Sequence, residues 1–198
     1  MPAAVELLDV VAYNADIEVG RFVIKSMDIN MNKIFEIAEN PKILIDKDFD
    51  SNLISIEGLK LDDDYRKINL LDIVEIHVRN YSNPYANFTE RLEQLKNYDG
   101  FIHMAGRFGF GIKNQKIIQI IFRGKYIDEL KNYDGQAIVD FCGKPNKVLT
   151  DSITWVFDYV EYAKILVYSD RRLYFFIDTE TKKVSEIRIG DVDEKFFT

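Results

Sequence analysis

The stretches LISIEG (residues 53–58), IQIIFRG (118–124) and VSEIRIG (184–190) each read as a β-strand that ends at a glycine. The closing residues, Gly58, Gly124 and Gly190, are 66 residues apart. Apolar helix-like runs elsewhere end in similar stop signals: Asn40-Pro41, Asn83-Pro84 and GKP at 143–145. Self-similarity at a fixed spacing is typical of internally repeated folds. We therefore predict an α+β protein of repeated units, each a helix plus an antiparallel β-meander, with mainly antiparallel sheet.

The repeat also sets the expected domain organisation. Residues 53–124 form the first predicted helix–meander unit and residues 125–198 the second. Residues 1–52 read as a strand–helix–strand segment, which can be taken as a degenerate copy. The chain contains no Pro/Gly/Ser-rich linker, so we expect the units to pack as one compact body.

Composition excludes several classes of protein. The chain has 198 residues and is 47% apolar, which is enough for a substantial core. Its net charge of −7 disfavours nucleic acid and anionic membranes and mildly favours basic partners. The lone Cys142 lies in an apolar stretch and is expected to be buried. With no signal peptide and no apolar run near the ~20 residues of a membrane span, we expect a soluble, cytoplasmic protein.

Hydrophobic spacing predicts the individual elements. We expect helices at 28–39, 69–78 and 134–142, and a hairpin that pairs 43–45 with 53–56. Residues 89–96 have helical composition, but the repeat aligns them with the strand-like 150–157, so we favour a strand there. The clearest strands are expected at 101–104, 108–112, 117–122, 153–157, 163–168, 173–177 and 184–189.

Three local patterns bear on chemistry. Residues 46–57 place acids at positions 1, 3, 5 and 12 of a twelve-residue loop, as calcium-binding loops do, but Ser51 replaces the glycine of the turn. We favour a solvated turn and keep calcium as the alternative. The glycines of residues 106–111 could form a phosphate-binding loop, but strand-like residues follow them. We therefore favour a glycine-bearing strand that packs closely against a neighbouring strand. His77 and His103 show no metal-ligand or catalytic spacing, so we predict no catalytic residue, metal or cofactor.

Two groups of residues are candidates for contact with a partner protein. The first is an acidic run, which would suit a basic partner: Asp62, Asp63 and Asp64. The second is an aromatic and acidic cluster of the kind that anchors interfaces: Trp155, Asp158, Tyr159 and Tyr162. For both groups the competing interpretation is structural, as a solvated turn and as part of the core.

The C-terminal part has a recognisable order of motifs: AIVDFCGKP (137–145), TWVFD (154–158), LYFF (173–176) and KVSEI (183–187). This order resembles small bacterial α+β modules, namely the helix-plus-meander units of β-lactamase-inhibitor-protein-like folds. It also resembles immunity proteins of bacterial polymorphic-toxin and contact-dependent inhibition systems. The resemblance covers residues 115–191 most fully and residues 53–124 in part. In the latter, Asn83-Pro84 replaces Gly-Lys-Pro, and Gln94 stands where an aromatic is expected.

The resemblance implies a non-enzymatic protein that binds and neutralises a cognate toxin stoichiometrically. It carries over no catalytic residue, and a basic toxin would suit the negative net charge. Two alternatives remain open on the residues alone. One is a small-molecule or calcium-binding module, and the other is an enzyme that combines His77 or His103 with scattered carboxylates and tyrosines.

Overall fold

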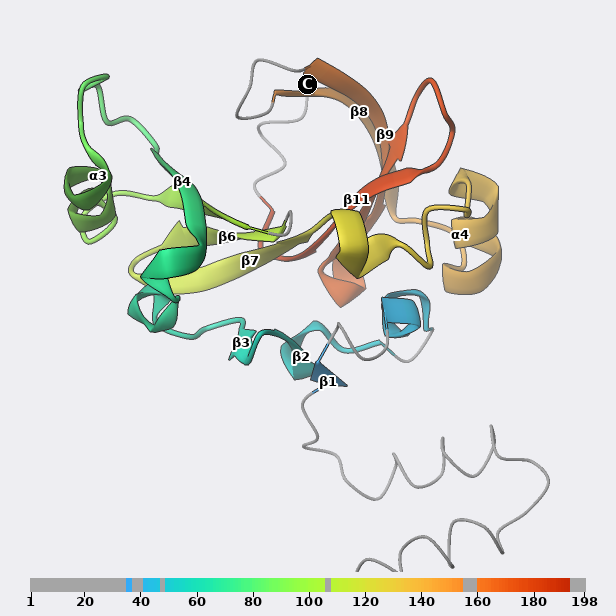
Figure 1. The fold of residues 1–198 in the computed structure, drawn as a ribbon. Helices are drawn as coiled ribbons and strands as arrows, with labels where there is room; N and C mark the ends of the chain where they lie inside the picture. The colour runs from blue at the N-terminus through green and yellow to red at the C-terminus, as the bar shows by residue number, and fades with distance from the viewer. Residues whose placement is uncertain (1–34, 37–40, 47–48, 106–107, 155–159, 193–198) are drawn as a thin grey trace, which may run out of the picture. The chain divides into compact units, whose positions relative to one another are not determined.

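A computed structural model of the chain describes residues 35–36, 41–46, 49–105, 108–154 and 160–192. The chain divides into two compact units, Met1–Ile34 and Phe35–Thr198, and every described residue belongs to the second. This part is α+β with a large antiparallel sheet (Figure 1). The helix expected at 28–39 is wrong at its only described positions, because Phe35–Glu36 form strand β1. Its other residues lie outside the described part.

Eight strands form the main sheet in the order β4-β5-β6-β7-β11-β10-β9-β8. All neighbours are antiparallel, so the sheet consists of two four-stranded meanders joined through β7 and β11. The strands expected at 101–104, 108–112 and 117–122 and the C-terminal meander are confirmed wherever they are described. The bounds are β4 Ile73–Val78, β5 Gly100–Met104, β6 Phe108–Lys113, β7 Lys116–Phe122, β8 Lys147–Thr154, β9 Val160–Tyr168, β10 Leu173–Asp178 and β11 Val184–Gly190.

The repeated helix–meander unit is not confirmed. Helix α3 (Phe88–Gln94) lies between β4 and β5, whereas α4 (Gly135–Cys142) precedes β8. The junction strands do follow the 66-residue spacing. Ile121 pairs with Arg188, and Phe122 pairs with Ile187. Ile187 lies 66 residues after Ile121 and Arg188 lies 66 residues after Phe122, so each pair joins one position of the repeat to the equivalent of its neighbour. The domain boundaries at 52–53 and 124–125 stay predictions, although the sheet runs on from β7 to β11.

The main core lies on one face of this sheet. It is covered by a small sheet of β1, β2 (Ile54–Ile56) and β3 (Leu59–Lys60) and by the short 3-10 helix η1 (Pro41–Ile45). Ile54 and Ile56 of β2 are fully buried in the same cluster as Phe110, Phe122 and Phe175 of the main sheet. Helix α4 adds Ile138 and Cys142 to this core, and Leu95, the residue that follows α3, is buried in it as well. Figure 1 shows the small sheet beneath β6, β7 and β11.

The other face of the main sheet, which we call the second face, carries a separate apolar cluster. Its buried members lie on β9 and β10: Ala163, Ile165, Val167, Tyr174 and Phe176. Strand β4 at one end and strands β8 and β9 at the other rise on the same side of the strands between them, so the sheet is strongly curved (Figure 1). In the described part of the chain, both α-helices pack with the main core rather than with this cluster.

The helix expected at 69–78 is wrong. Residues Leu70–Asp72 form a 3-10 turn, η4, and Ile73–Val78 form β4. Ile76 and Val78 are buried while His77 between them is exposed, which is the two-residue alternation of a strand. The β-branched residues of this segment fit a pleated sheet better than a helix, and the pairing with β5 decides the outcome.

The strand favoured at 89–96 is also wrong, because the helical composition prevails. Helix α3 begins after Asn87, whose Oδ1 accepts a hydrogen bond of 2.9 Å from the backbone N of Glu90. The predicted hairpin of 43–45 with 53–56 is wrong as well. Residues 43–45 belong to η1, and β2 turns back at Gly58 to pair with β3 instead.

Two local predictions are confirmed. Helix α4 begins after Asp134, whose Oδ1 accepts a hydrogen bond of 2.9 Å from Ala137 N, and it ends at Gly143, as expected for 134–142. Gly111 of β6 packs closely against a neighbouring strand, since an added Cβ would lie 2.9 Å from the Cβ of Gln119.

Candidate functional site

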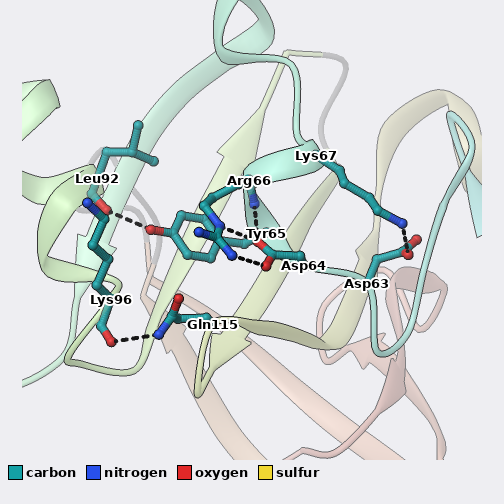
Figure 2. Close-up of polar contacts among 8 residues, drawn as sticks. All are labelled: Asp63, Asp64, Tyr65, Arg66, Lys67, Leu92, Lys96 and Gln115. Carbon is teal, nitrogen blue, oxygen red and sulfur yellow. Dashed lines mark hydrogen bonds and ion pairs between the residues drawn. The ribbon is translucent and has the colours of Figure 1, made fainter.

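Two carboxylates of the predicted acidic run are paired with basic residues that follow it in the same turn (Figure 2). Asp63 Oδ1 lies 2.5 Å from Lys67 Nζ, and Asp64 accepts hydrogen bonds from Arg66 Nε at 2.8 Å and from its terminal nitrogen at 2.5 Å. These bonds from Arg66 hold the pKa of Asp64 below its ordinary value. The run therefore offers a basic partner less negative charge than its sequence indicates.

Hydrogen bonds hold this turn and the neighbouring β6–β7 hairpin against α3 and the residues that follow it. The hydroxyl of the buried Tyr65 donates to the carbonyl of Leu92 at 3.3 Å, and Gln115 Nε2 donates to the carbonyl of Lys96 at 3.4 Å (Figure 2). The second predicted group is not brought to this place, because Tyr162 belongs to β9 in the other meander. Trp155, Asp158 and Tyr159 lie outside the described residues. A partner-binding role for both groups stays a prediction.

Exposed apolar side chains are concentrated in the segment that runs from η4 through β4 to the end of α3, and α3 lies beside β4 at one end of the sheet (Figure 1). Of the eight large apolar side chains exposed in the described part of the chain, six lie between residues 70 and 98. An excess of exposed large apolar side chains makes this segment a candidate for an interaction site. We call these six side chains the β4–α3 surface: Leu70, Leu71, Val74, Tyr85, Phe88 and Tyr98.

Tyr85 shares with Leu71 the largest exposure of the six, 92% of the residue. Its loop is held by the next helix, because Glu90 of α3 accepts hydrogen bonds from the Tyr81 hydroxyl and, at 3.0 Å, from Asn83 Nδ2. Asn83 Oδ1 in turn accepts a hydrogen bond of 3.0 Å from Tyr85 N. The loop is therefore ordered while the tyrosine ring projects into solvent. A loop that is already held in place loses less conformational entropy when it binds a partner.

Arg91, the neighbour of Glu90 on α3, holds the same loop and also covers the edge of the sheet. Its Nε donates to the Ala86 carbonyl at 3.0 Å, and a terminal nitrogen donates to the carbonyl of Ile76 on β4 at 3.2 Å. Strand β4 is an edge strand with a register shift between Ile73 and Glu75. Bulges and covered carbonyls both hinder the addition of another strand. The surface is thus suited to contact through side chains rather than through strand pairing.

The β4–α3 surface was missed from the sequence because two element predictions failed together. A helix at 69–78 places Leu71 and Val74 on its inner face, and a strand at 89–96 removes the helix that holds the Tyr85 loop. The usable signals were the alternation of IVEIHV at 73–78 and the cap Asn87 three residues before Glu90.

Two described carboxylates of the proposed calcium loop already have hydrogen-bond partners in the fold. Asp50 of the proposed calcium loop caps its own turn through Asn52 N at 2.9 Å, and Glu57 accepts from the Tyr126 hydroxyl at 2.7 Å. Within the described ranges, no group of three or more His, Cys, Asp or Glu is arranged to hold a metal ion. Cys142 is buried as predicted, and burial raises the pKa of its thiol to about 11.

We expect Glu90→Ala to release the Tyr85 loop. The variant removes the acceptor of both Tyr81 and Asn83, so amide hydrogen exchange at Tyr85 and Ala86 should accelerate severalfold, as measured by NMR. Glu93→Ala is the matched control, because Glu93 lies on the same helix and contacts Lys96 instead. Equal exchange in the two variants would contradict this account of the loop.

The same carboxylate gives the loop a dependence on pH. The hydrogen bond from Tyr81 lowers the pKa of Glu90 below its ordinary 4.5. A carboxyl group whose pKa is lower in the folded chain than in the unfolded chain stabilises the fold at pH values above its unfolded pKa. This stabilisation is lost as the pH falls through the pKa of the folded chain. In the wild type we therefore expect the loop amides to stay protected at pH 5 and to lose protection only below pH 4.5.

Neither the helices of the described residues nor comparisons with known proteins identify a function for this chain. No described helix has the length and apolar character needed to cross a membrane. No protein-family model, curated protein or solved structure matches the chain.

Proposed function

We propose that this chain is a non-enzymatic binding protein whose partner is another protein, held through the β4–α3 surface. The observation that carries the proposal is the concentration of six exposed large apolar side chains between residues 70 and 98. Interfaces are enriched in tyrosine and phenylalanine, and a few buried aromatic anchors supply most of their binding energy. Tyr85 on its ordered loop has the properties of such an anchor.

The resemblance to bacterial immunity proteins supports a narrower form of this proposal. The partner is then a cognate toxin, which the chain neutralises in the cytoplasm by stoichiometric binding. The net charge of −7 favours association with a basic toxin. Asp62, an exposed residue of the turn that contacts α3 through Tyr65, would add to that attraction.

The test is co-purification with the product of a toxin-like gene adjacent to the gene for this chain. We expect a one-to-one complex that Tyr85→Ala weakens at least about 30-fold, since anchor residues contribute about 2 kcal/mol or more. Leu71→Asp should weaken it similarly, because it places a charge among the exposed apolar side chains.

The control is Phe141→Asp, which changes an exposed aromatic residue on α4, outside the proposed surface. It should leave binding unchanged. A complex that tolerates both Tyr85→Ala and Leu71→Asp, or that Phe141→Asp disrupts instead, would remove the β4–α3 surface from the proposal.

A further inference from the structure

Strand β8 is the edge of the main sheet opposite to β4. In the described sheet it pairs on one side only, with β9, and this pairing runs without a register shift from Lys147–Val167 to Thr154–Val160. Strand β4, the other edge, has a register shift, and Arg91 covers one of its carbonyls. Long, regular edge strands are templates for a further strand, and proteins usually interrupt them. Of the two edges, β8 is therefore the one suited to strand pairing.

The first half of β8 has apolar side chains on both faces of the sheet. Val148 lies on the face of the main core, because it pairs with Leu166 of that core, yet it is 50% exposed. Thr150, two residues on, is exposed on the same face. Leu149 lies on the second face, where it packs, partly buried, against the apolar cluster. A strand that pairs with β8 therefore covers apolar surface on both faces.

The sequence of β8 is complementary to itself in one antiparallel register. In a two-fold dimer, residues that pair across the axis lie on the same face, so a single residue at the centre pairs with its own copy. Centring on Leu149 sets Leu149 opposite Leu149, Val148 opposite Thr150 and Lys147 opposite Asp151. An apolar residue then meets its own copy at the centre, and a positive residue meets a negative one on either side of the axis.

The neighbouring registers lack this match. Centring on Val148 sets Lys147 opposite Leu149, and centring on Thr150 sets Asp151 opposite Leu149. Each of these registers places a charged residue opposite an apolar one twice, because the axis repeats every pair. Apolar pairs and pairs of opposite charge stabilise neighbouring antiparallel strands. The register centred on Leu149 is therefore the favourable one.

We propose that the occupant of the β8 edge is a second copy of this chain, paired antiparallel with the register centred on Leu149. The two main sheets then join into one continuous antiparallel sheet across a two-fold axis. Because the contact rests on one short strand from each copy, it is a weak one, with a dissociation constant on the order of 100 µM. The proposal goes beyond the binding function above and does not depend on it, since β8 and β4 stand at opposite ends of the strand order.

Sedimentation velocity of the purified full chain measures this self-association. The concentration is raised from about 10 µM to about 1 mM, which brackets the expected dissociation constant. A buffer of about 0.15 M salt screens the net charge of −7 on each copy. We expect the wild type to pass from monomer to dimer over this range. Over the same range, amide hydrogen exchange in the first half of β8 should slow.

Two double variants test the pairing by loss and by rescue. Val148→Lys/Thr150→Lys and Val148→Glu/Thr150→Glu each place like charges opposite one another twice, so each alone should weaken the dimer at least about tenfold. Mixed in equal amounts, they place lysine opposite glutamate twice and should form a heterodimer at least as readily as the wild type does. Both positions are exposed, so the variants should fold, which circular dichroism checks. A variant that was merely unfolded would not be rescued by mixing.

A third double variant, Val148→Lys/Thr150→Glu, tests the register. With Leu149 at the centre it pairs lysine with glutamate and should dimerise as the wild type does, whereas a centre at Val148 or Thr150 pairs like charges and prevents this. Tyr85→Ala, on the β4–α3 surface, should leave self-association unchanged. The proposal is overturned if the wild type stays monomeric up to about 1 mM, or if the like-charged variants dimerise as the wild type does. It is also overturned if their mixture stays monomeric, if the third variant fails to dimerise, or if Tyr85→Ala abolishes the dimer.

Discussion

Replacing Glu186 by alanine should lower the free energy of unfolding by about 3–5 kcal/mol, the usual cost of removing one partner from a buried ion pair. Glu186 is fully buried and forms ion pairs with Arg123 and Arg188, whose side chains are only 20% and 13% exposed. The variant takes away the carboxylate that both guanidinium groups share, in a place with little access for water. Because Arg123 follows β7 and Glu186 lies on β11, the loss falls on the only strand pairing that joins the two meanders within the described sheet.

Urea unfolding at pH 7.5 measures this effect, with Glu129→Ala as the matched control. Glu129 pairs with Lys42 at 3.4 Å, but their side chains are 54% and 57% exposed. Exposed pairs contribute less than about 1 kcal/mol, so the control should be nearly neutral. If both variants lose the same small amount of stability, the Arg123–Glu186–Arg188 cluster does not hold the junction together.

The strands were predictable wherever apolar residues alternate or run together. The runs at 118–122, 173–177 and 184–189 are strands because no competing pattern exists there. Helix α4 was equally predictable, since Asp134 and Gly143 mark its two ends. The prediction at 89–96 failed because the predicted repeat outweighed the local signal. Residues 89–96 have the composition of a helix and form α3, although the repeat aligned them with a strand.

The contacts that join the two meanders and those that define the candidate site could not be derived from spacing. Arg123 and Glu186 are 63 residues apart, and only the pairing of β7 with β11 brings them together. Likewise, the exposure of Tyr85 depends on Glu90 and Arg91, which hold its loop only if residues 88–94 are a helix. Local sequence determines each element, but the neighbours of a side chain depend on strand order. That order follows from long-range packing.

The glycine that ends β11 should be the backbone position most sensitive to a methyl group. Gly190 has φ of +99°, and an added Cβ would lie 2.1 Å from the carbonyl oxygen of Ile118 and 3.0 Å from Cα of Gln119. Both contacts are with backbone of β7, which cannot move aside while Gly190 pairs with Gln119. We expect Gly190→Ala to cost about 2–5 kcal/mol, from backbone strain of about 1–2 kcal/mol plus overpacking of about 1–3 kcal/mol.

Gly58 separates these two causes, because it also has a positive φ, +76°, but an added Cβ would meet nothing within 4 Å. Gly58→Ala should therefore cost about 1 kcal/mol, since the strain is partly offset by the lower entropy of the unfolded chain. Urea unfolding of both variants measures the difference, and failure of Gly190→Ala to fold counts as the larger effect. Equal losses would mean that the close approach of β7 to Gly190 is not what requires a glycine there. The 66-residue spacing would then reflect only a shared turn conformation, and not the packing of the junction.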